Sequence, residues 1–197
     1  MTTVVVISTP ETAGRDLEIE RDVLGAGVEI VEVPYDSDGQ KPGSAICGAD
    51  IIATELAPIT RSFLDEWPRC RLVSITGTGH DNVDLAAIKD AGISLCTVAE
   101  YCTNEVADHV LMLMLALMRR LVEYHDLVQS QHLWQFDSLA GLQRFSKLTV
   151  GIIGFGRIGQ AVSRRVLGFG ARVLAHDYRP IEHAPRDERA QFCDLDT

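Results

Sequence analysis

One short segment constrains the fold of this chain more than any other. Residues 154–159 have the sequence Gly-Phe-Gly-Arg-Ile-Gly, a GxGxxG motif. The apolar residues 148–153 precede it, and residues 157–167 follow with apolar side chains at helical spacing. Residues 171–175, Ala-Arg-Val-Leu-Ala, are again mainly apolar. The pattern therefore predicts a strand, a tight turn, a helix and a second strand, which is a βαβ unit.

Each glycine of this motif has its own physical reason. Gly154 permits the tight turn, Gly156 lets the backbone approach a pyrophosphate, and Gly159 lets the helix pack closely on the strand. The start of the helix adds unbonded N–H groups and a partial positive charge. The motif thus favours binding of a dinucleotide. A glycine turn without a ligand, or a loop for FAD or S-adenosylmethionine, are the alternatives.

An acidic residue follows at the spacing that a dinucleotide fold requires. Asp177 comes directly after the second strand and lies 18 residues beyond Gly159. A carboxylate at this place binds the ribose hydroxyls of NAD and repels the 2′-phosphate of NADP. Arg179 is close enough to weaken that preference. The predicted cofactor is therefore NAD.

The first half of the chain alternates between strand-like and helix-like segments. Such alternation predicts a parallel sheet with helices on its faces, hence an α/β fold. The unit ends near residue 100, so we expect one domain over residues 1–100 and a second over residues 101–197. The expected strands are 4–7, 28–33, 50–53, 72–76 and 93–97, and the expected helices are 15–24, 60–66 and 84–91.

A single long helix is expected over residues 104–128. Thr103 or Asn104 can cap its start, and Glu105 suits the helix dipole there. The stretch Val110–Met118 is apolar on all sides, which predicts burial on several sides. Either it is a core helix, or it lies between two domains or two subunits.

A second glycine loop, Gly77-Thr78-Gly79, follows the strand expected at 72–76. Parallel sheets bind ligands at the carboxyl ends of their strands, so these backbone N–H groups are candidates for an anion such as a carboxylate. A plain turn, in which the stretch Asp81–Asp84 caps the next helix, explains the loop equally well. His80 lies in the loop and is the histidine most worth testing, and the six histidines lack the spacing of metal ligands.

Charge and composition exclude several kinds of partner. Lys and Arg number 18 and Asp and Glu number 28, so the formal net charge is -10. Such a chain is unsuited to non-specific binding of nucleic acid or of anionic membranes. The nine-residue apolar run Val110–Met118 is too short to cross a bilayer, which takes about 20 residues. The five cysteines include no CxxC pair, and we expect reduced thiols in a cytoplasmic protein.

Three ordered motifs carry a resemblance to a known family. Residues Thr78–Asp84, Tyr101–His109 and Leu148–Gly159 resemble the D-isomer-specific 2-hydroxyacid dehydrogenases. The second motif is most similar to the branch that includes the C-terminal-binding-protein (CtBP) co-repressors. The resemblance implies a flavodoxin-like substrate domain, followed by a linking helix and the N-terminal part of a Rossmann NAD-binding domain. It also implies hydride transfer between NADH and a 2-keto acid.

The resemblance also assigns roles to individual residues. It implies that Gly77, Thr78 and Gly79 hold the substrate carboxylate and that Thr78 also lies near the cofactor. It implies a homodimer built by the long helix and the arm after it. The residues implied to bind the cofactor are Thr78, Val106 near the nicotinamide, Gly154, Phe155, Gly156, Arg157, Ile158 and Gly159 around the pyrophosphate, and Asp177 on the ribose.

The family's catalytic Arg and its Glu–His pair have no counterpart up to Thr197, because they follow the second strand of the NAD domain. We therefore expect a C-terminally truncated chain with an incomplete Rossmann domain that is inactive alone. Three hypotheses remain open: a truncated NAD-dependent dehydrogenase, a non-catalytic NAD-binding or partner-binding module similar to the co-repressors, and a half-enzyme completed by another polypeptide. The keto acid stays undecided.

Overall fold

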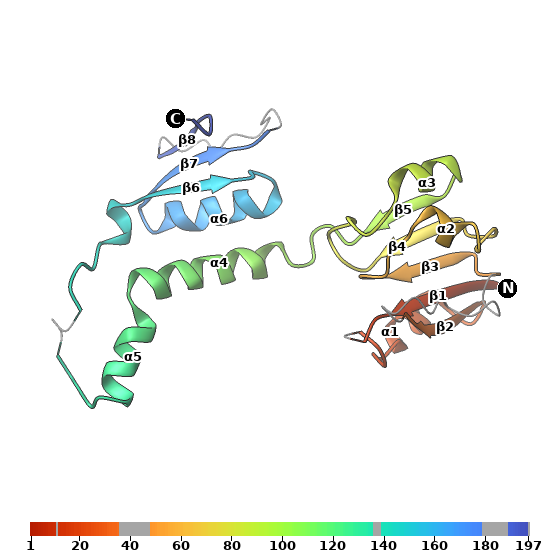
Figure 1. Ribbon diagram of the computed structural model, residues 1–197, viewed down its shortest axis with the longest axis horizontal. Coiled ribbons are helices and arrows are strands. Elements are labelled where there is room, and N and C mark those ends of the chain that lie inside the picture. The colour runs from red at the N-terminus through yellow and green to blue at the C-terminus, as the bar shows by residue number, and fades with distance from the viewer. Residues whose placement is uncertain (11, 36–47, 136–138, 179–188, 197) are drawn as a thin grey trace. The chain divides into compact units, whose positions relative to one another are not determined.

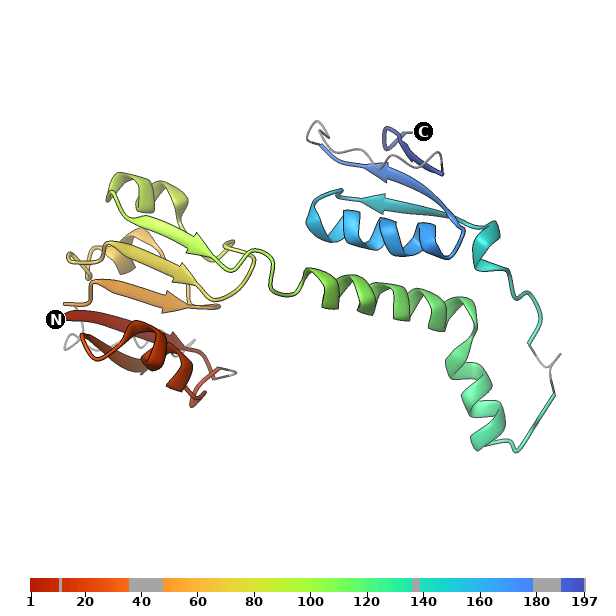
Figure 2. The ribbon, with the colours of Figure 1, turned by 180° about the vertical axis from the view of Figure 1, so that it is seen from behind.

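A computed structural model describes residues 1–10, 12–35, 48–135, 139–178 and 189–196. The chain forms two compact units, Met1–Ala99 and Glu100–Thr197, and each contains its own parallel sheet (Figures 1 and 2). Within the described ranges, no helix has both the length and the apolar character that a membrane span requires.

The first unit is built on a five-stranded sheet in which every pairing is parallel. The strand order is β2-β1-β3-β4-β5, the flavodoxin-like order of a doubly wound sheet. The predicted α/β class and parallel sheet are confirmed. The strands are β1 Thr2–Ser8, β2 Val28–Pro34, β3 Ile51–Thr54, β4 Leu72–Ile75 and β5 Ser94–Thr97.

Two short helices, α2 (Arg61–Leu64) and α3 (Leu85–Asp90), contribute to the core of this unit. Phe63 and Trp67 stack with ring centroids 5.5 Å apart, and both pack with buried residues of β1, β3 and β4. The expected helix over 15–24 is shorter, α1 (Glu18–Leu24), and buries none of its own side chains. Among residues 15–24, Leu17, directly before α1, is the one buried residue.

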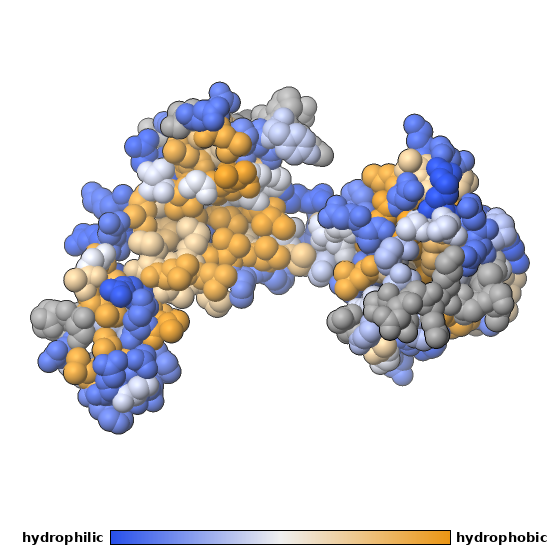
Figure 3. All heavy atoms as spheres, in the orientation of Figure 1, coloured by the Kyte–Doolittle hydropathy of each residue, from blue (hydrophilic) through white to orange (hydrophobic). Residues whose placement is uncertain are grey.

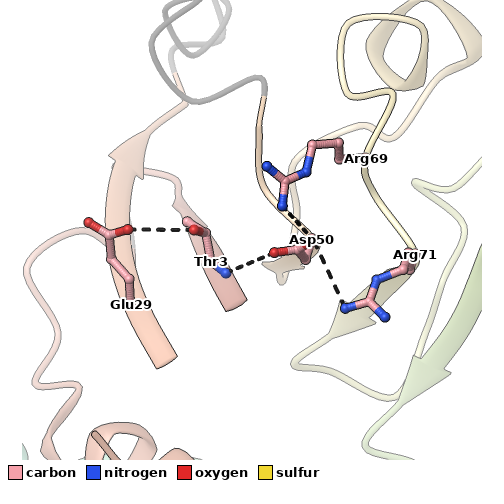
Figure 4. Close-up of polar contacts among 5 residues, drawn as sticks. All are labelled: Thr3, Glu29, Asp50, Arg69 and Arg71. Atoms are coloured by element: carbon pink, nitrogen blue, oxygen red, sulfur yellow. Dashed lines mark hydrogen bonds and ion pairs between the residues drawn. The ribbon is translucent and has the colours of Figure 1, made fainter. Parts of the chain in front are cut away.

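Asp50 fastens the amino ends of several strands of the first sheet (Figure 4). Its carboxylate accepts the Thr3 N–H at 3.0 Å and a hydrogen bond from Arg69 at 3.1 Å, and Arg71 lies 3.9 Å away. The Thr3 N–H is the largest influence and, together with Arg69, lowers the pKa of Asp50, although burial opposes the shift. The ionised form is therefore the one that stabilises the fold.

The pH dependence of unfolding should reveal this contribution. The ordinary pKa of the group is 3.8 and the folded value is lower, so the stabilisation is complete above about pH 4 and disappears as the pH falls through the folded pKa. We expect Asp50→Asn to lower the urea midpoint near neutral pH, and the difference from wild type to shrink as the pH falls below 3.8. A difference that is the same at both pH values would contradict this role of the charge.

The second unit contains a three-stranded parallel sheet in the order β6-β7-β8, with strands β6 (Thr149–Ile153), β7 (Arg172–His176) and β8 (Ala190–Phe192). Helix α6 (Arg157–Gly168) connects β6 to β7 and packs on the sheet (Figures 1 and 2). The predicted βαβ unit is confirmed. The sequence indicated only two strands here, and the third pairs with β7 from Val173 to Ala175.

The expectation of one long helix over 104–128 is wrong. The chain forms α4 (Thr103–Met118) and α5 (Leu121–Gln129), separated at Arg119 and Arg120. Arg120 has φ 51°, a left-handed conformation that no helix interior accommodates. Its guanidinium pairs with Glu123 and donates to the Ala140 carbonyl oxygen, and these contacts support the bend.

Helix α4 lies along α6, and Arg165 joins the two helices. Arg165 of α6 donates to Asp108 at 2.5 Å and reaches the carbonyl oxygen of Asn104 at 3.4 Å. The expected burial of Val110–Met118 on several sides is wrong within this chain, because α6 covers only one side. Ala107 is the one fully buried residue of α4, while Leu117 is 78% exposed.

Candidate functional site

The predicted glycine loop and Asp177 meet at the carboxyl edge of the second sheet. Because β6 and β7 are parallel and pair Ile153 with His176, the residues that follow them leave the sheet side by side. The Gly154 N–H donates to the His176 carbonyl oxygen at 2.8 Å. This pairing extends the register by one residue and brings the loop next to Asp177, as the sequence led us to expect.

The three glycines of the motif meet three different requirements. Gly154 has φ +91°, a conformation that favours glycine. A Cβ on Gly159 would overlap the Gly154 carbonyl oxygen and lie 3.1 Å from the Gly154 carbonyl carbon, so α6 approaches the turn too closely for any side chain. A Cβ on Gly156 would meet no atom within 4 Å. The turn is therefore closely packed where α6 approaches Gly154, and open at Gly156.

The helix that leaves this loop begins where a phosphate site requires it. Gly156 is the N-cap of α6, and its side chain, a hydrogen atom, supplies no capping acceptor. The first N–H groups of a helix need an acceptor, and the dipole places positive potential there. An anionic ligand in the open space at Gly156 meets both needs. The residues present thus fit the pyrophosphate of a dinucleotide.

Asp177 interacts directly with the glycine loop. Its Oδ2 atom accepts the Phe155 N–H at 2.6 Å, a charge-assisted hydrogen bond. Phe155 itself is only 3% exposed, and its ring meets Phe192 edge-to-face with centroids 5.0 Å apart. The ribose role expected for Asp177 is compatible with this bond, because a carboxylate has a second oxygen. Arg179 lies outside the described residues.

Other residues expected at this site surround the loop. Arg157 begins α6, and its Nη1 lies 3.8 Å from Oε1 of Glu100, both side chains being exposed to solvent. Ile158 is half-buried and packs against the core of the unit. Val106 is half-buried in the first turns of α4.

The second glycine loop belongs to the first unit and follows β4. The Val98 N–H donates to the Gly77 carbonyl oxygen at 3.0 Å, and the Thr78 hydroxyl donates to the Val98 carbonyl oxygen at 3.3 Å. Gly77 is buried and Gly79 is exposed, with no atom within 4 Å of a Cβ at Gly79. The loop is thus anchored at one end and open at the other, as an anion-binding loop needs.

The capping role that the sequence offered for this region is present as well. The Asp84 side chain accepts the Ala87 N–H at 2.9 Å and caps α3, while His80 is exposed and its carbonyl oxygen accepts the Val83 N–H. Among the described residues, no three His, Cys, Asp or Glu side chains gather as a metal site. The turn and capping role is therefore present, and the open side at Gly79 is compatible with the anion-binding role that the sequence predicted.

Comparison with known families identifies the second half of the chain. Residues 111–197 match the family described as D-isomer specific 2-hydroxyacid dehydrogenase, NAD binding domain. Over these residues, the chain is similar to the D-isomer specific 2-hydroxyacid dehydrogenase family. The match includes the glycine loop and Asp177, so the site described above lies inside the region that resembles that family's NAD-binding domain.

Relatives in the family extend the similarity beyond that domain. A glyoxylate reductase of Thermococcus gammatolerans is 36% identical over 155 residues, which are 75% of this chain and 46% of the relative. A D-3-phosphoglycerate dehydrogenase of Mycobacterium leprae is 35% identical over 157 residues, 78% of this chain and 29% of the relative. The chain spans about half the length, or less, of the curated relatives it matches.

A solved structure shows the same fold. The D-lactate dehydrogenase of Aquifex aeolicus, crystallised with NAD and lactic acid, superposes with a TM-score of 0.83 at 27% identity. The match covers 98% of this chain and 56% of that one. These relatives are named as reductases and dehydrogenases, so they support the family as a whole and do not single out the co-repressor branch that the motif Tyr101–His109 suggested.

Proposed function

We propose that this chain binds NAD at the glycine loop of its second unit and serves in an NAD-dependent dehydrogenase that interconverts 2-keto and D-2-hydroxy acids. The observation that carries the proposal is the open space in front of Gly156, next to the start of α6 and to Asp177. The family's NAD-binding domain covers these same residues. We place the activity in the cytoplasm.

The proposed cofactor contacts follow from the geometry of the loop. Gly156, Arg157 and Ile158 supply backbone N–H groups, and Arg157 supplies a cation for the pyrophosphate. Gly154 and Phe155 shape the loop around it, because their own N–H groups are bonded to His176 and Asp177. Gly159 serves indirectly, because it lets α6 start close to the strand. Asp177 would hold the ribose hydroxyls, and Thr78 and Val106 would lie near the nicotinamide end. When bound, the nicotinamide supplies the hydride chemistry.

The choice between NAD and NADP should depend on the charge of Asp177. In Asp177→Asn the amide oxygen can still accept the Phe155 N–H, but the negative charge is gone. We expect the ratio of NAD to NADP affinity to fall about 10-fold, because repulsion of the 2′-phosphate is removed and the ribose bonds weaken. Calorimetric titration with both nucleotides measures the ratio, and Asp196→Asn is a control. Equal changes for both nucleotides would count against the ribose role.

The substrate is proposed to be a small 2-keto acid whose carboxylate binds the N–H groups of Gly77, Thr78 and Gly79. Glyoxylate, hydroxypyruvate and pyruvate are suitable probes, since the relatives are named for glyoxylate, lactate and related acids. The alternative is a nucleotide-binding or partner-binding module without turnover. Oxidation of NADH by the purified chain above a protein-free control, with any of the three acids, would exclude that alternative.

An apolar surface on α4 and α5 favours a homodimer. Side chains of both helices line a groove of about 530 Å³, and they are mainly aliphatic: Asp108, Leu111, Met112, Leu115, Ala116, Arg119 and Leu121. Figure 3 shows apolar residues gathered over α4 on this face. Exposed apolar surface of this kind marks an interaction site. We propose that a second copy of the chain covers it.

A charge placed in this groove should separate the dimer. Leu121 is 60% exposed and begins α5, where an aspartate is compatible with the helix. We expect Leu121→Asp to raise the dimer dissociation constant at least about 10-fold, the effect of removing one buried leucine from an interface. Analytical ultracentrifugation measures the change. The control is Ile19→Asp in α1, also an exposed aliphatic residue near a helix start, which should leave the dimer intact.

A further inference from the structure

Side chains hold both backbone polar groups of Phe155, its N–H and its carbonyl oxygen. On the donor side, the Phe155 N–H bonds to the Asp177 carboxylate at 2.6 Å. On the acceptor side, the Phe155 carbonyl oxygen receives Nε2 of Gln160 at 3.0 Å. Gln160 lies in the first turn of α6 and is half-buried. Two side chains from different elements therefore fix one residue of the loop.

The ring of Phe155 adds a third constraint. It is buried and contacts Phe192 of β8 edge-to-face, an arrangement that stabilises aromatic pairs. Rotation of either peptide group that flanks the Phe155 Cα would therefore break a hydrogen bond, and a larger rearrangement of the Phe155 backbone would break both and displace a packed ring. Glycines on both sides of Phe155 leave the backbone otherwise free to rotate, so these contacts replace the stiffness that the glycines lack.

We propose that Gln160 is a positioning residue. Together with Asp177 it fixes the backbone of Phe155, so that the loop already has the conformation that binds the pyrophosphate before the nucleotide arrives. The inference rests on the nucleotide-binding function proposed above. Ordering a loop residue has a cost in conformational entropy. A loop that is already ordered in the free protein avoids this cost on binding. Gln160 thus acts through Phe155 and need not touch the ligand.

The proposal predicts which ligands depend on Gln160. NAD and ADP use the loop through their diphosphate, whereas adenosine has no phosphate and would depend on Asp177 alone. Gln160→Leu keeps the size and helix propensity of the residue but removes the donor. We expect the affinity for NAD and for ADP to fall about 3- to 10-fold, as for the loss of one hydrogen bond, and that for adenosine to change less than about 2-fold.

The matched control is Gln131→Leu. Gln131 also donates one side-chain hydrogen bond, to Asp126 at 2.9 Å, but it lies beyond α5 and away from the loop. Its affinities should equal those of the wild type. Equal losses for adenosine and ADP in Gln160→Leu would show a general structural effect and overturn the proposal. Unchanged affinity for NAD and ADP would do the same.

Hydrogen exchange in the ligand-free protein tests the lock without any nucleotide. The Phe155 N–H should exchange about 3- to 10-fold faster in Gln160→Leu than in the wild type, and at the wild-type rate in Gln131→Leu. Unchanged exchange in Gln160→Leu overturns the inference. If instead the wild type shows the expected protection but no nucleotide binding, the proposed function fails while the lock stands, so the two failures are distinguishable.

Discussion

Gly159→Ala is expected to destabilise the second unit by about 3 kcal/mol, which corresponds to a fall in melting temperature of more than about 10 °C. The reason is a backbone overlap. The new Cβ would overlap the Gly154 carbonyl oxygen, and it would lie 3.4 Å from a methyl group of Ile152. Neither the turn nor α6 can move aside cheaply, because the turn pairs with β7 and α6 packs on the sheet.

The same helix offers a control for this prediction. Gly168 is the last residue of α6, and a Cβ there would meet no atom within 4 Å. Gly168→Ala should leave the melting temperature unchanged or raise it slightly, since alanine is the better helix former. Thermal denaturation followed by circular dichroism compares the two variants. A Gly159→Ala protein as stable as the Gly168→Ala protein would contradict the close packing at the loop.

Gly156→Val should affect binding instead of stability, in contrast to Gly159→Ala. The fold should remain stable, and NAD binding should be lost. Its Cβ would project into open space, and φ of -71° is accessible to valine, so the chain should fold with a melting temperature close to that of the wild type, although valine is a poorer N-cap than glycine. The branched side chain would occupy the space proposed for the pyrophosphate. Loss of the charge-assisted hydrogen bonds there would weaken NAD binding about 10- to 100-fold.

Gly27→Val serves as the matched control. Gly27 is a glycine of the first unit. A Cβ added there would meet no atom within 4 Å, and its φ lies outside the left-handed region. Both valine variants should melt like the wild type, and only Gly156→Val should lose affinity for NAD and ADP in calorimetric titration. Retained affinity in Gly156→Val would mean that the nucleotide does not bind against this loop.

Local patterns predicted the βαβ unit because its information is local. An apolar strand, glycines at fixed spacing and an amphipathic helix follow each other in residues 148–167, and the acid at position 177 follows by strand length. The parallel sheet of the first unit was predictable for the same reason. Strands that alternate with helices leave few other arrangements.

The features that escaped prediction depend on contacts between distant residues. Nothing in the sequence marks Arg120, a non-glycine residue with φ 51°, as the end of a helix. Strand β8 is three residues long, and its sequence Ala-Gln-Phe is too weakly apolar to predict a strand. Only its pairing with β7 identifies it as one. Gln160 is an ordinary helix residue by propensity, and only the folded loop brings its amide to the Phe155 carbonyl oxygen. Its spacing of five residues from Phe155 was the one available signal.

The exposed surface of α4 has a similar explanation. Its apolar run Val110–Met118 predicts burial, but the sequence does not say which element would cover it. Within the chain α6 covers one side, through residues such as Val110 and Met114, and the rest stays exposed. The same residues thus belong in part to the core and in part to the proposed dimer surface.

Titration of the purified 197-residue chain with NAD and with ADP measures whether the glycine loop binds a nucleotide. We expect saturable binding of both ligands at one site per chain, with loss of both in Gly156→Val and retention of both in Gly27→Val. If the folded wild-type chain bound neither ligand at about millimolar concentration, its binding free energy would be weaker than about -4 kcal/mol. That result would contradict nucleotide binding at this loop.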